Sequence, residues 1–329
     1  MEQRLDMAGL LTTSVGSLPK PEYLVKARNK VTRGEMTQED LHPLELQATR
    51  EWVEFQDSIG IDIIVDGEQY RGDMTAYFAE NWEGMAISGL VRSYGNRYYR
   101  KPVVVGELKR PKPTTVDMWR YAQSLTKRPV KGMLTGPYTM MDWSFDEHYS
   151  SRRDCALAFA KVIHDEATDL AAAGAKYVQI DEPAISTRPE EFEMAREALG
   201  IVTKGLNAHT ITHICYGDFG VLYPQLLELP VDNLDLEMKN SNFDLLELFK
   251  KNKFTKELSC GVVDVHSHRV ESVEEIKDGI NKVLEVIPPE RLYIDPDCGL
   301  KTRQPDEAKQ KLKNMVQAVR EIKRERGIA

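Results

Sequence analysis

The segment Arg291-Leu-Tyr-Ile-Asp-Pro-Asp-Cys-Gly-Leu-Lys-Thr-Arg303 shows the pattern on which the predicted fold is built. A short apolar run ends in Asp-Pro-Asp, and a thiol follows just beyond the predicted strand end. Two earlier segments, 212–216 and 234–238, repeat this pattern of an apolar run that ends in polar or thiol side chains. The same kind of short run recurs along the whole chain, which indicates a series of strands with functional groups at their ends.

Eight strand-like segments follow one another, and helical segments separate most of them. The predicted strands are 11–19, 61–68, 130–137, 176–183, 209–216, 233–238, 258–264 and 291–295. The predicted helices are 44–59, 151–173, 190–205, 221–229, 242–252, 272–286 and 306–326. This series predicts an α/β fold, a (β/α)8 TIM barrel. The alternative, a doubly wound sheet, would use fewer strands and a glycine-rich phosphate turn after the first strand, which Gly16-Ser-Leu-Pro19 is not.

Residues 80–127 interrupt the alternation of strands and helices. Aromatic residues, glycines and the run Val103-Val-Val-Gly106 alternate there with basic residues. This composition predicts a β-hairpin excursion after the second strand. We therefore predict one catalytic domain over residues 1–329, with the hairpin inserted at about 80–127.

Composition excludes several classes of protein. The 329 residues carry a formal net charge of -8, which argues against a partner that is a nucleic acid or an anionic membrane. No apolar run approaches the roughly 18 residues that a membrane span needs, and the first residues lack the apolar core of a secretion signal. We expect a cytoplasmic protein, in which four scattered cysteines are buried apolar residues or metal ligands rather than a disulfide framework.

Four strand-end residues form a candidate metal site. His213 and Cys215 alternate along one strand and therefore share a face. Glu237 ends the sixth strand, and Cys298 follows the eighth. Strand ends converge at one mouth of a TIM barrel, so one imidazole, two thiols and one carboxylate are available as a tetrahedral zinc set. Each residue alone is a weak signal, because isolated strand-end glutamates are usually solvated and isolated buried cysteines usually pack.

Further strand-end residues have both functional and structural interpretations. Glu68, Asp181 and Glu182 could bind a substrate ammonium group, or form ion pairs with arginines such as Arg71. The stripe of apolar residues around Cys155 predicts that this thiol lies in the core.

Two ring side chains also have both a functional and a structural interpretation. The functional interpretation of His266, between Asp264 and Ser267, is a proton donor that a carboxylate orients. The structural interpretation is a histidine whose hydrogen bonds only support the fold. Trp143 is a stacking platform for a flat cofactor or a hydrophobic cover. His268 is predicted to be a turn residue.

The motifs resemble those of a known family, the cobalamin-independent methionine synthases, and specifically their C-terminal catalytic barrel. The matching segments are Val15-Gly-Ser17, Asp66-Gly-Glu68, Thr135-Gly-Pro-Tyr-Thr139 with Trp143-Ser, Ile180-Asp-Glu-Pro-Ala184, His213-Ile-Cys215-Tyr, Glu237, Asp264-Val-His266-Ser and Pro296-Asp-Cys-Gly-Leu-Lys-Thr-Arg303. They occur in family order over nearly the whole chain, which makes the resemblance specific.

The resemblance implies a role for each candidate residue. It implies a Zn²⁺ cofactor bound by His213, Cys215, Glu237 and Cys298. It also implies homocysteine held by Ser17 at its carboxylate and by Glu68 and Asp181 at its amino group. His266, helped by Asp181, would protonate a folate leaving group, and Trp143 would stack on the pterin.

The chain departs from the family pattern in two ways that concern the methyl donor. It lacks the length for the second, N-terminal barrel of the full-length family, and Thr187 stands where the pattern usually has an acidic residue that contacts the pterin. The chain thus resembles the short, single-barrel relatives, some of which take the methyl group from a methyl-corrinoid. By this resemblance we expect methyl transfer to homocysteine from a methyl-corrinoid, either methylcobalamin or a corrinoid protein. The alternatives are methyl-tetrahydrofolate as donor, or a zinc-dependent alkyltransferase that acts on another small thiol such as coenzyme M. A non-enzymatic alternative is a zinc-stabilised barrel that serves as a binding or regulatory subunit.

Overall fold

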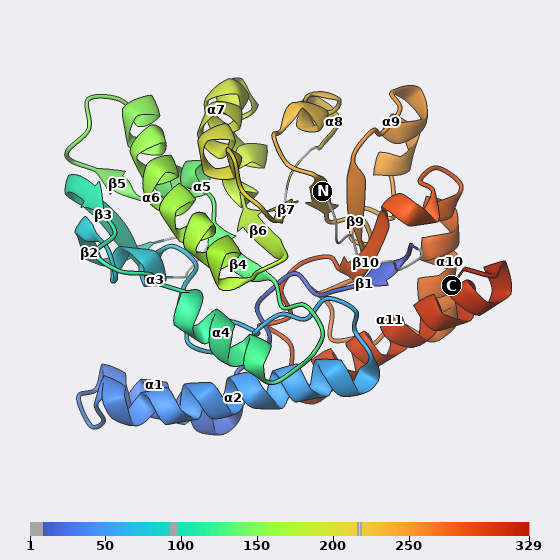
Figure 1. Cartoon of the computed structure of the whole chain (residues 1–329), viewed down its shortest axis with the longest axis horizontal. Helices are drawn as coiled ribbons and strands as arrows, with labels where there is room; N and C mark the ends of the chain where they lie inside the picture. The colour runs from blue at the N-terminus through green and yellow to red at the C-terminus, as the bar shows by residue number, and fades with distance from the viewer. Residues whose placement is uncertain (1–8, 93–97, 216, 218, 329) are drawn as a thin grey trace. The chain divides into compact units, whose positions relative to one another are not determined.

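The computed structural model describes residues 9–92, 98–215, 217 and 219–328. The chain forms two compact units. The first unit comprises Met1–Tyr70, Arg120–Lys131 and Asn233–Ala329, and the second comprises Arg71–Trp119 and Gly132–Asp232. Both combine parallel strands with helices, as Figure 1 shows.

The first unit contains the parallel strand order β1-β10-β9-β8. Its elements are β1 (Leu11–Thr12), α1 (Glu22–Thr32), α2 (Gln38–Ile59), β8 (Asn233–Leu236), α9 (Leu245–Lys251), β9 (Glu257–Val263), α10 (Val273–Leu284), a 3₁₀ turn (Pro289–Arg291), β10 (Leu292–Pro296) and α11 (Pro305–Arg326). Strands β8, β9 and β10 are buried along their whole length. Strands β9 and β10 read mostly as apolar runs, as buried parallel strands commonly do, whereas β8 alternates polar and apolar side chains that are all buried.

The second unit contains the parallel strand order β7-β6-β4. Its elements are α3 (Ala76–Ala79), β2 (Glu83–Arg92), β3 (Tyr98–Lys109), β4 (Gly132–Thr135), α5 (Pro137–Asp142), β5 (Phe145–Asp146), α6 (Arg152–Ala173), β6 (Tyr177–Asp181), α7 (Phe192–Thr203), β7 (His209–Ile214) and α8 (Phe219–Leu222), with 3₁₀ turns at Pro183–Thr187, Pro189–Glu191 and Gln225–Glu228. Helix α4 (Val116–Ser124) contributes residues to both units. Helices α6 and α7 pack side by side (Figure 1).

The predicted hairpin excursion is confirmed for the strands β2 and β3, which end at Lys109, whereas helix α4 occupies part of the remaining predicted segment up to 127. Strands β2 and β3 pair antiparallel, with Ala86 opposite Val103, and β5 adds a short parallel strand at the edge of β3. These strands form a separate three-stranded sheet.

Each unit places its strand ends at one edge of a sheet. In the first unit, Leu234 pairs with Leu258 and Leu292 pairs with Leu258 from the other side, so β8, β9 and β10 run in register. In the second unit, Val178 pairs with both Gly132 and Thr210, so β4, β6 and β7 do the same. The carboxyl ends of parallel strands meet at one edge, so each unit gathers its own strand-end side chains there.

The second predicted strand is the main difference from the sequence analysis. Residues 61–68, all of which the structure describes, contain an isolated parallel bridge between Ile64 and Val130 rather than a strand. Beyond that bridge the side chain of Gln56 takes the place of a neighbouring strand. Its Nε2 donates to the carbonyl of Val65 at 2.8 Å, and its Oε1 accepts from the Val65 N–H at 3.1 Å. Because both backbone groups are paired in this way, no strand ladder is needed there.

The helices agree with the prediction apart from their ends and four omissions. Helix α2 begins at Gln38 rather than at 44, because Thr37 and Asp40 form a capping box. Helices α1, α3, α4 and α5 were not predicted. The predicted helix 221–229 is α8 followed by a 3₁₀ turn. Cys155 is completely buried on α6, which confirms its place in the core. In the part of the chain that the structure describes, no helix is both long and apolar enough to cross a membrane.

We expect the substitution Gln56→Ala to lower the free energy of unfolding by about 2–4 kcal/mol, because it leaves a buried N–H and a buried carbonyl of Val65 unpaired. Urea denaturation measures this loss. The matched control on the same helix is Gln47→Ala, whose side chain bonds the exposed Glu51 and should change stability by no more than about 0.5 kcal/mol. Equal losses in the two variants would contradict the role given to Gln56.

Candidate functional site

Two of the predicted ligands lie together in the second unit. His213 is on β7 and Cys215 follows its last residue, so the two side chains share a face of the strand. They are 3% and 5% exposed, and one ligand atom of each lies within 4.8 Å of the other. An imidazole and a thiol at this separation, shielded from water, have the donor types that zinc prefers. This pair therefore fits the zinc ion that the sequence predicts.

The neighbouring carboxylate, Glu182, holds the backbone rather than a substrate. It is completely buried, and its oxygens accept from the N–H of Tyr138 and from the N–H and hydroxyl of Thr139 at 2.7–2.9 Å. Burial raises the pKa of Glu182 to about 7, although these donors oppose the shift. A Cβ on Gly136 would lie 2.2 Å from this carboxyl group, so a glycine is required there. The idea that Glu182 binds a substrate ammonium group is therefore wrong.

The hydrogen bonds of Glu182 join the segments that carry other candidate residues. Its backbone N–H donates to the carbonyl of His213 at 2.9 Å. The amides that its side chain binds are in the first turn of α5, the helix that ends at Trp143. The indole of Trp143 is half-buried, and Asp181, the last residue of β6, accepts from Gln179 Nε2 at 2.7 Å. The second unit therefore holds these candidates on rigid strand and helix ends.

In the first unit, the structure brings Glu237 and His266 together. Glu237 follows β8 and is 5% exposed. Its Oε1 lies 3.3 Å from His266 Nε2. Asp264, which was expected to orient the ring of His266, instead accepts from its backbone N–H at 2.7 Å. The imidazole of His266 thus contacts the carboxylate of Glu237, while Asp264 binds the backbone of the turn.

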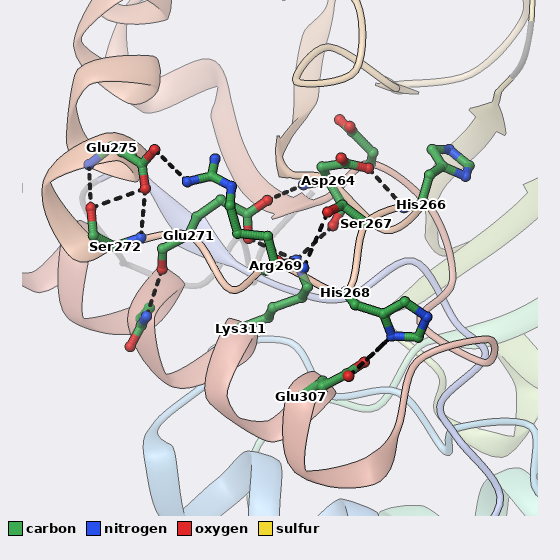
Figure 2. A network of polar contacts seen from close by, with 12 residues as sticks. Asp264, His266, Ser267, His268, Arg269, Glu271, Ser272, Glu275, Glu307 and Lys311 are labelled. Carbon is green, nitrogen blue, oxygen red and sulfur yellow. Dashed lines mark hydrogen bonds and ion pairs between the residues drawn. The ribbon is translucent and has the colours of Figure 1, made fainter.

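A buried ion pair holds the loop that carries His266 (Figure 2). Lys311 of α11 and Glu271 are both at most 1% exposed, and their charged atoms are 2.8 Å apart. Lys311 Nζ also donates to the carbonyls of Asp264 and Arg269, and Glu271 Oε1 accepts from the Asp264 N–H at 3.0 Å. The pair therefore fixes both ends of the turn around His266. His268 points away from Lys311 in this view and pairs with Glu307 at 3.0 Å.

The loops that carry Ser17 and Cys298 touch in the same unit. The N–H of Leu300 donates to the carbonyl of Ser17 at 2.8 Å. A Cβ on Gly299 would lie 2.0 Å from Ser17 Oγ, so glycine is required beside Cys298 for this approach. Cys298 itself is partly exposed. A hydroxyl and a thiol thus lie on adjoining loops.

Glu68 has an unusual backbone conformation. Its φ is +54°, in the left-handed region that costs a residue with a side chain about 1–2 kcal/mol. The N–H of Glu68 donates to Asp66 at 2.8 Å, and Lys20 Nζ donates to its carbonyl at 3.2 Å. Burial, with Arg28 nearby, lowers the pKa of Lys20 to about 8. Strained backbone of this kind is common at functional sites.

Several residues that support the candidate site were not found from the sequence. Lys311 is far from the motifs in sequence, and no sequence pattern distinguishes a buried lysine from the exposed ones beside it on a helix. Glu271 lies just after the Asp264-Val-His266-Ser motif, but nothing in the sequence indicates its burial. Asp297 is next to Cys298 in the quoted segment, and its place directly after a strand was a usable signal. The predicted zinc set takes two residues from each unit and stays a prediction.

The likeness to a solved structure defines the class of fold. The structure of a B12-independent methionine synthase from Shewanella sp. W3-18-1, in complex with selenomethionine, matches with a TM-score of 0.86 at 30% identity. The match covers 97% of this chain and 99% of the other. The predicted α/β fold of the TIM-barrel type is thereby confirmed.

The sequence comparisons define the family. Residues 10–321 match the family model described as "Cobalamin-independent synthase, Catalytic domain". A protein named methionine synthase from Saccharolobus solfataricus is 40% identical over 317 residues, which are 96% of each chain. A 5-methyltetrahydropteroyltriglutamate--homocysteine methyltransferase from Thermotoga sp. is 38% identical over 333 residues, and this chain spans 45% of its length. The chain belongs to the cobalamin-independent methionine synthase family.

We expect Lys311→Met to lower the free energy of unfolding by about 3–5 kcal/mol, because Glu271 would remain buried without its cation. The double variant Lys311→Met/Glu271→Gln should recover part of the loss, since the glutamine is neutral and its oxygen still accepts from the Asp264 N–H. Urea denaturation of the single and double variants gives the coupling energy.

The control for this pair is Lys250→Met, which removes an exposed lysine paired with Glu247. Exposed pairs contribute little, so stability should hardly change. A double variant no more stable than Lys311→Met would contradict the assignment of the loss to an unpaired carboxylate.

Proposed function

We propose that this protein transfers a methyl group from methyl-tetrahydrofolate to the thiol of homocysteine and so forms methionine. The observation that carries the proposal is the match of residues 10–321 to the catalytic domain of the family. Relatives that are similar over most of this chain are named methionine synthase.

A zinc ion bound by His213, Cys215, Glu237 and Cys298 is part of the proposal. The buried imidazole and thiol at the end of β7 support it, as do the carboxylate and thiol that follow β8 and β10. Zinc, when bound, lowers the pKa of a coordinated thiol, so that a nucleophilic thiolate is available at neutral pH. Zinc is therefore the proposed cofactor.

The remaining candidates bind the amino acid. The hydroxyl of Ser17 suits the substrate carboxylate, and the carboxylates of Glu68 and Asp181 suit its ammonium group. The strained backbone of Glu68 and the contact of Ser17 with the loop of Cys298 support placing them near the reacting thiol. A clamp of two carboxylates favours an amino-acid thiol over a sulfonate such as coenzyme M.

The donor side of the proposed reaction needs a proton. The carbon–nitrogen bond of the methyl donor breaks as the carbon–sulfur bond forms, and the leaving nitrogen takes a proton. His266 is the proposed donor of that proton, with Asp181 as its helper, and Trp143 is the proposed stacking surface for the pterin. The half-buried indole of Trp143 at a helix end is consistent with this role.

The names of the relatives change the preferred donor. The sequence alone favoured a methyl-corrinoid, with the folate as the alternative. The family description contains the word cobalamin-independent, and the Thermotoga relative is named for a methyl-folate donor. Both names favour the folate, and the corrinoid is no longer preferred. A location in the cytoplasm stays a prediction.

The test is a methyl-transfer assay on the zinc-loaded protein with homocysteine, run in parallel with methyl-tetrahydrofolate and with methylcobalamin. We expect methionine from the folate. Methionine from methylcobalamin alone would overturn the donor, and methionine from neither donor would overturn the homocysteine assignment.

A substitution tests the metal ligands separately from activity. Cys298→Ser should lower zinc affinity by more than about 100-fold, because even the loss of a hydrogen-bonding partner of a ligand costs 10–100-fold. Competition with a chromophoric chelator measures the affinity. Cys155→Ser, which changes a buried thiol of α6, should bind zinc as the parent does. Unchanged zinc binding in Cys298→Ser would remove Cys298 from the site.

A further inference from the structure

Asp297 lies in the loop that carries Cys298 and binds the loop that follows Glu237, and both loops belong to the first unit. It is completely buried and directly precedes Cys298. Its carboxylate accepts three backbone N–H groups: Oδ1 from Met238 at 3.0 Å and Lys239 at 2.8 Å, and Oδ2 from Asn240 at 2.8 Å. These three residues directly follow Glu237. One side chain therefore joins the backbone beside Cys298 to the backbone beside Glu237.

The local structure of β9 and β10 makes room for this carboxylate. Asp295 pairs with Gly261 and Pro296 pairs with Val263, so the register shifts by one residue just before Asp297. A shift of this kind re-aims the side chains that follow it. A Cβ on Gly261 would lie 2.2 Å from Asp297 Oδ1 and 2.7 Å from its Cα, so only glycine leaves the space.

The contacts of Asp297 fix the direction of the loop after β8. Three successive N–H groups converge on one carboxyl group, which restricts the backbone of the segment 238–240. The N–H of Asp297 also donates to the carbonyl of Val263 at 3.0 Å, which ties the same point to the end of β9. The side chain thus links the ends of β8, β9 and β10.

We propose that Asp297 is a positioning residue for the metal site, which sets the place of Glu237 relative to Cys298 by holding residues 238–240. It touches neither substrate nor metal in this role and acts through the two ligands beside it. The inference rests on the proposed zinc site. Outer partners that orient metal ligands typically contribute 10–100-fold to metal affinity.

Two variants disturb this arrangement by different means. In Asp297→Asn, the amide oxygen can still accept from Met238 and Lys239, but the amide NH₂ then faces the N–H of Asn240, so two donors meet. Gly261→Ala keeps the carboxylate and displaces it by the new Cβ. If position rather than charge matters, both variants should have the same defect.

The matched control is Glu166→Gln. Glu166 on α6 is also completely buried, and it accepts from the N–H groups of Thr114 and Thr115 and from Arg110. None of these residues is a candidate for the site. The control therefore measures what the loss of a buried carboxylate clamp does to stability alone.

The experiment measures zinc affinity by chelator competition, the visible absorption spectrum of the Co²⁺-substituted protein, and urea denaturation of each metal-free variant. We expect Asp297→Asn and Gly261→Ala to lose 10–100-fold in zinc affinity and to share an altered Co²⁺ spectrum. Glu166→Gln should lose stability while its zinc affinity and Co²⁺ spectrum stay those of the parent.

The outcomes separate this inference from the proposed function. A parent protein that binds no zinc would overturn the proposed metal site itself. Stoichiometric zinc in the parent, with unchanged affinity and spectrum in both Asp297→Asn and Gly261→Ala, would overturn the positioning role alone. Equal losses of zinc affinity in all three variants would also overturn it, because stability would then explain them.

Discussion

Backbone N–H groups that are buried at the ends of strands must be paired, and in this protein buried carboxylates pair several of them. Such groups cost free energy when they are left without a partner, and the loops that follow parallel strands have no ladder to supply one. Glu182 meets this need in the second unit, and Glu271 and Asp297 meet it in the first. Each carboxylate is buried and binds the loop beside a candidate site residue. The pairing that the fold requires therefore also orders the site.

Glycines complete this arrangement. Gly136 and Gly261 leave the space that the carboxyl groups of Glu182 and Asp297 occupy. Gly299 does the same for the hydroxyl of Ser17. A carboxylate or hydroxyl can approach the backbone this closely only where a Cβ is missing. The glycines near the motifs thus act by close approach, and a positive φ is not the reason at these three positions.

The parts of the fold that the sequence predicts are those whose burial is uniform. Strands β9 and β10 are buried on both faces and read mostly as apolar runs, and the stripe around Cys155 marks the buried side of α6. The segment 61–68 looks the same in sequence, yet the side chain of Gln56, from another element, replaces the strand ladder. Tertiary hydrogen bonds of this kind leave no local pattern.

The candidate site also contains features that a local sequence pattern predicts and features that tertiary contacts decide. The alternation of His213 and Cys215 on one face is a local property and could be predicted. The contact of His266 with Glu237, and the contact of Asp264 with a backbone N–H, depend on how a turn folds. Lys311 could not be predicted, because its burial is decided by acceptors from residues more than 40 positions away.

The left-handed backbone at Glu68 has a consequence for any attempt to stabilise this protein. A glycine would adopt φ +54° without the steric cost that a glutamate bears. A search that ranks substitutions by folding free energy alone would therefore choose glycine at this position, and would discard a carboxylate to which we give a role in binding the substrate. The substitution that raises stability at position 68 would remove a proposed substrate contact. Heat-resistant variants that carry a change at this residue should therefore be the first to be assayed for turnover.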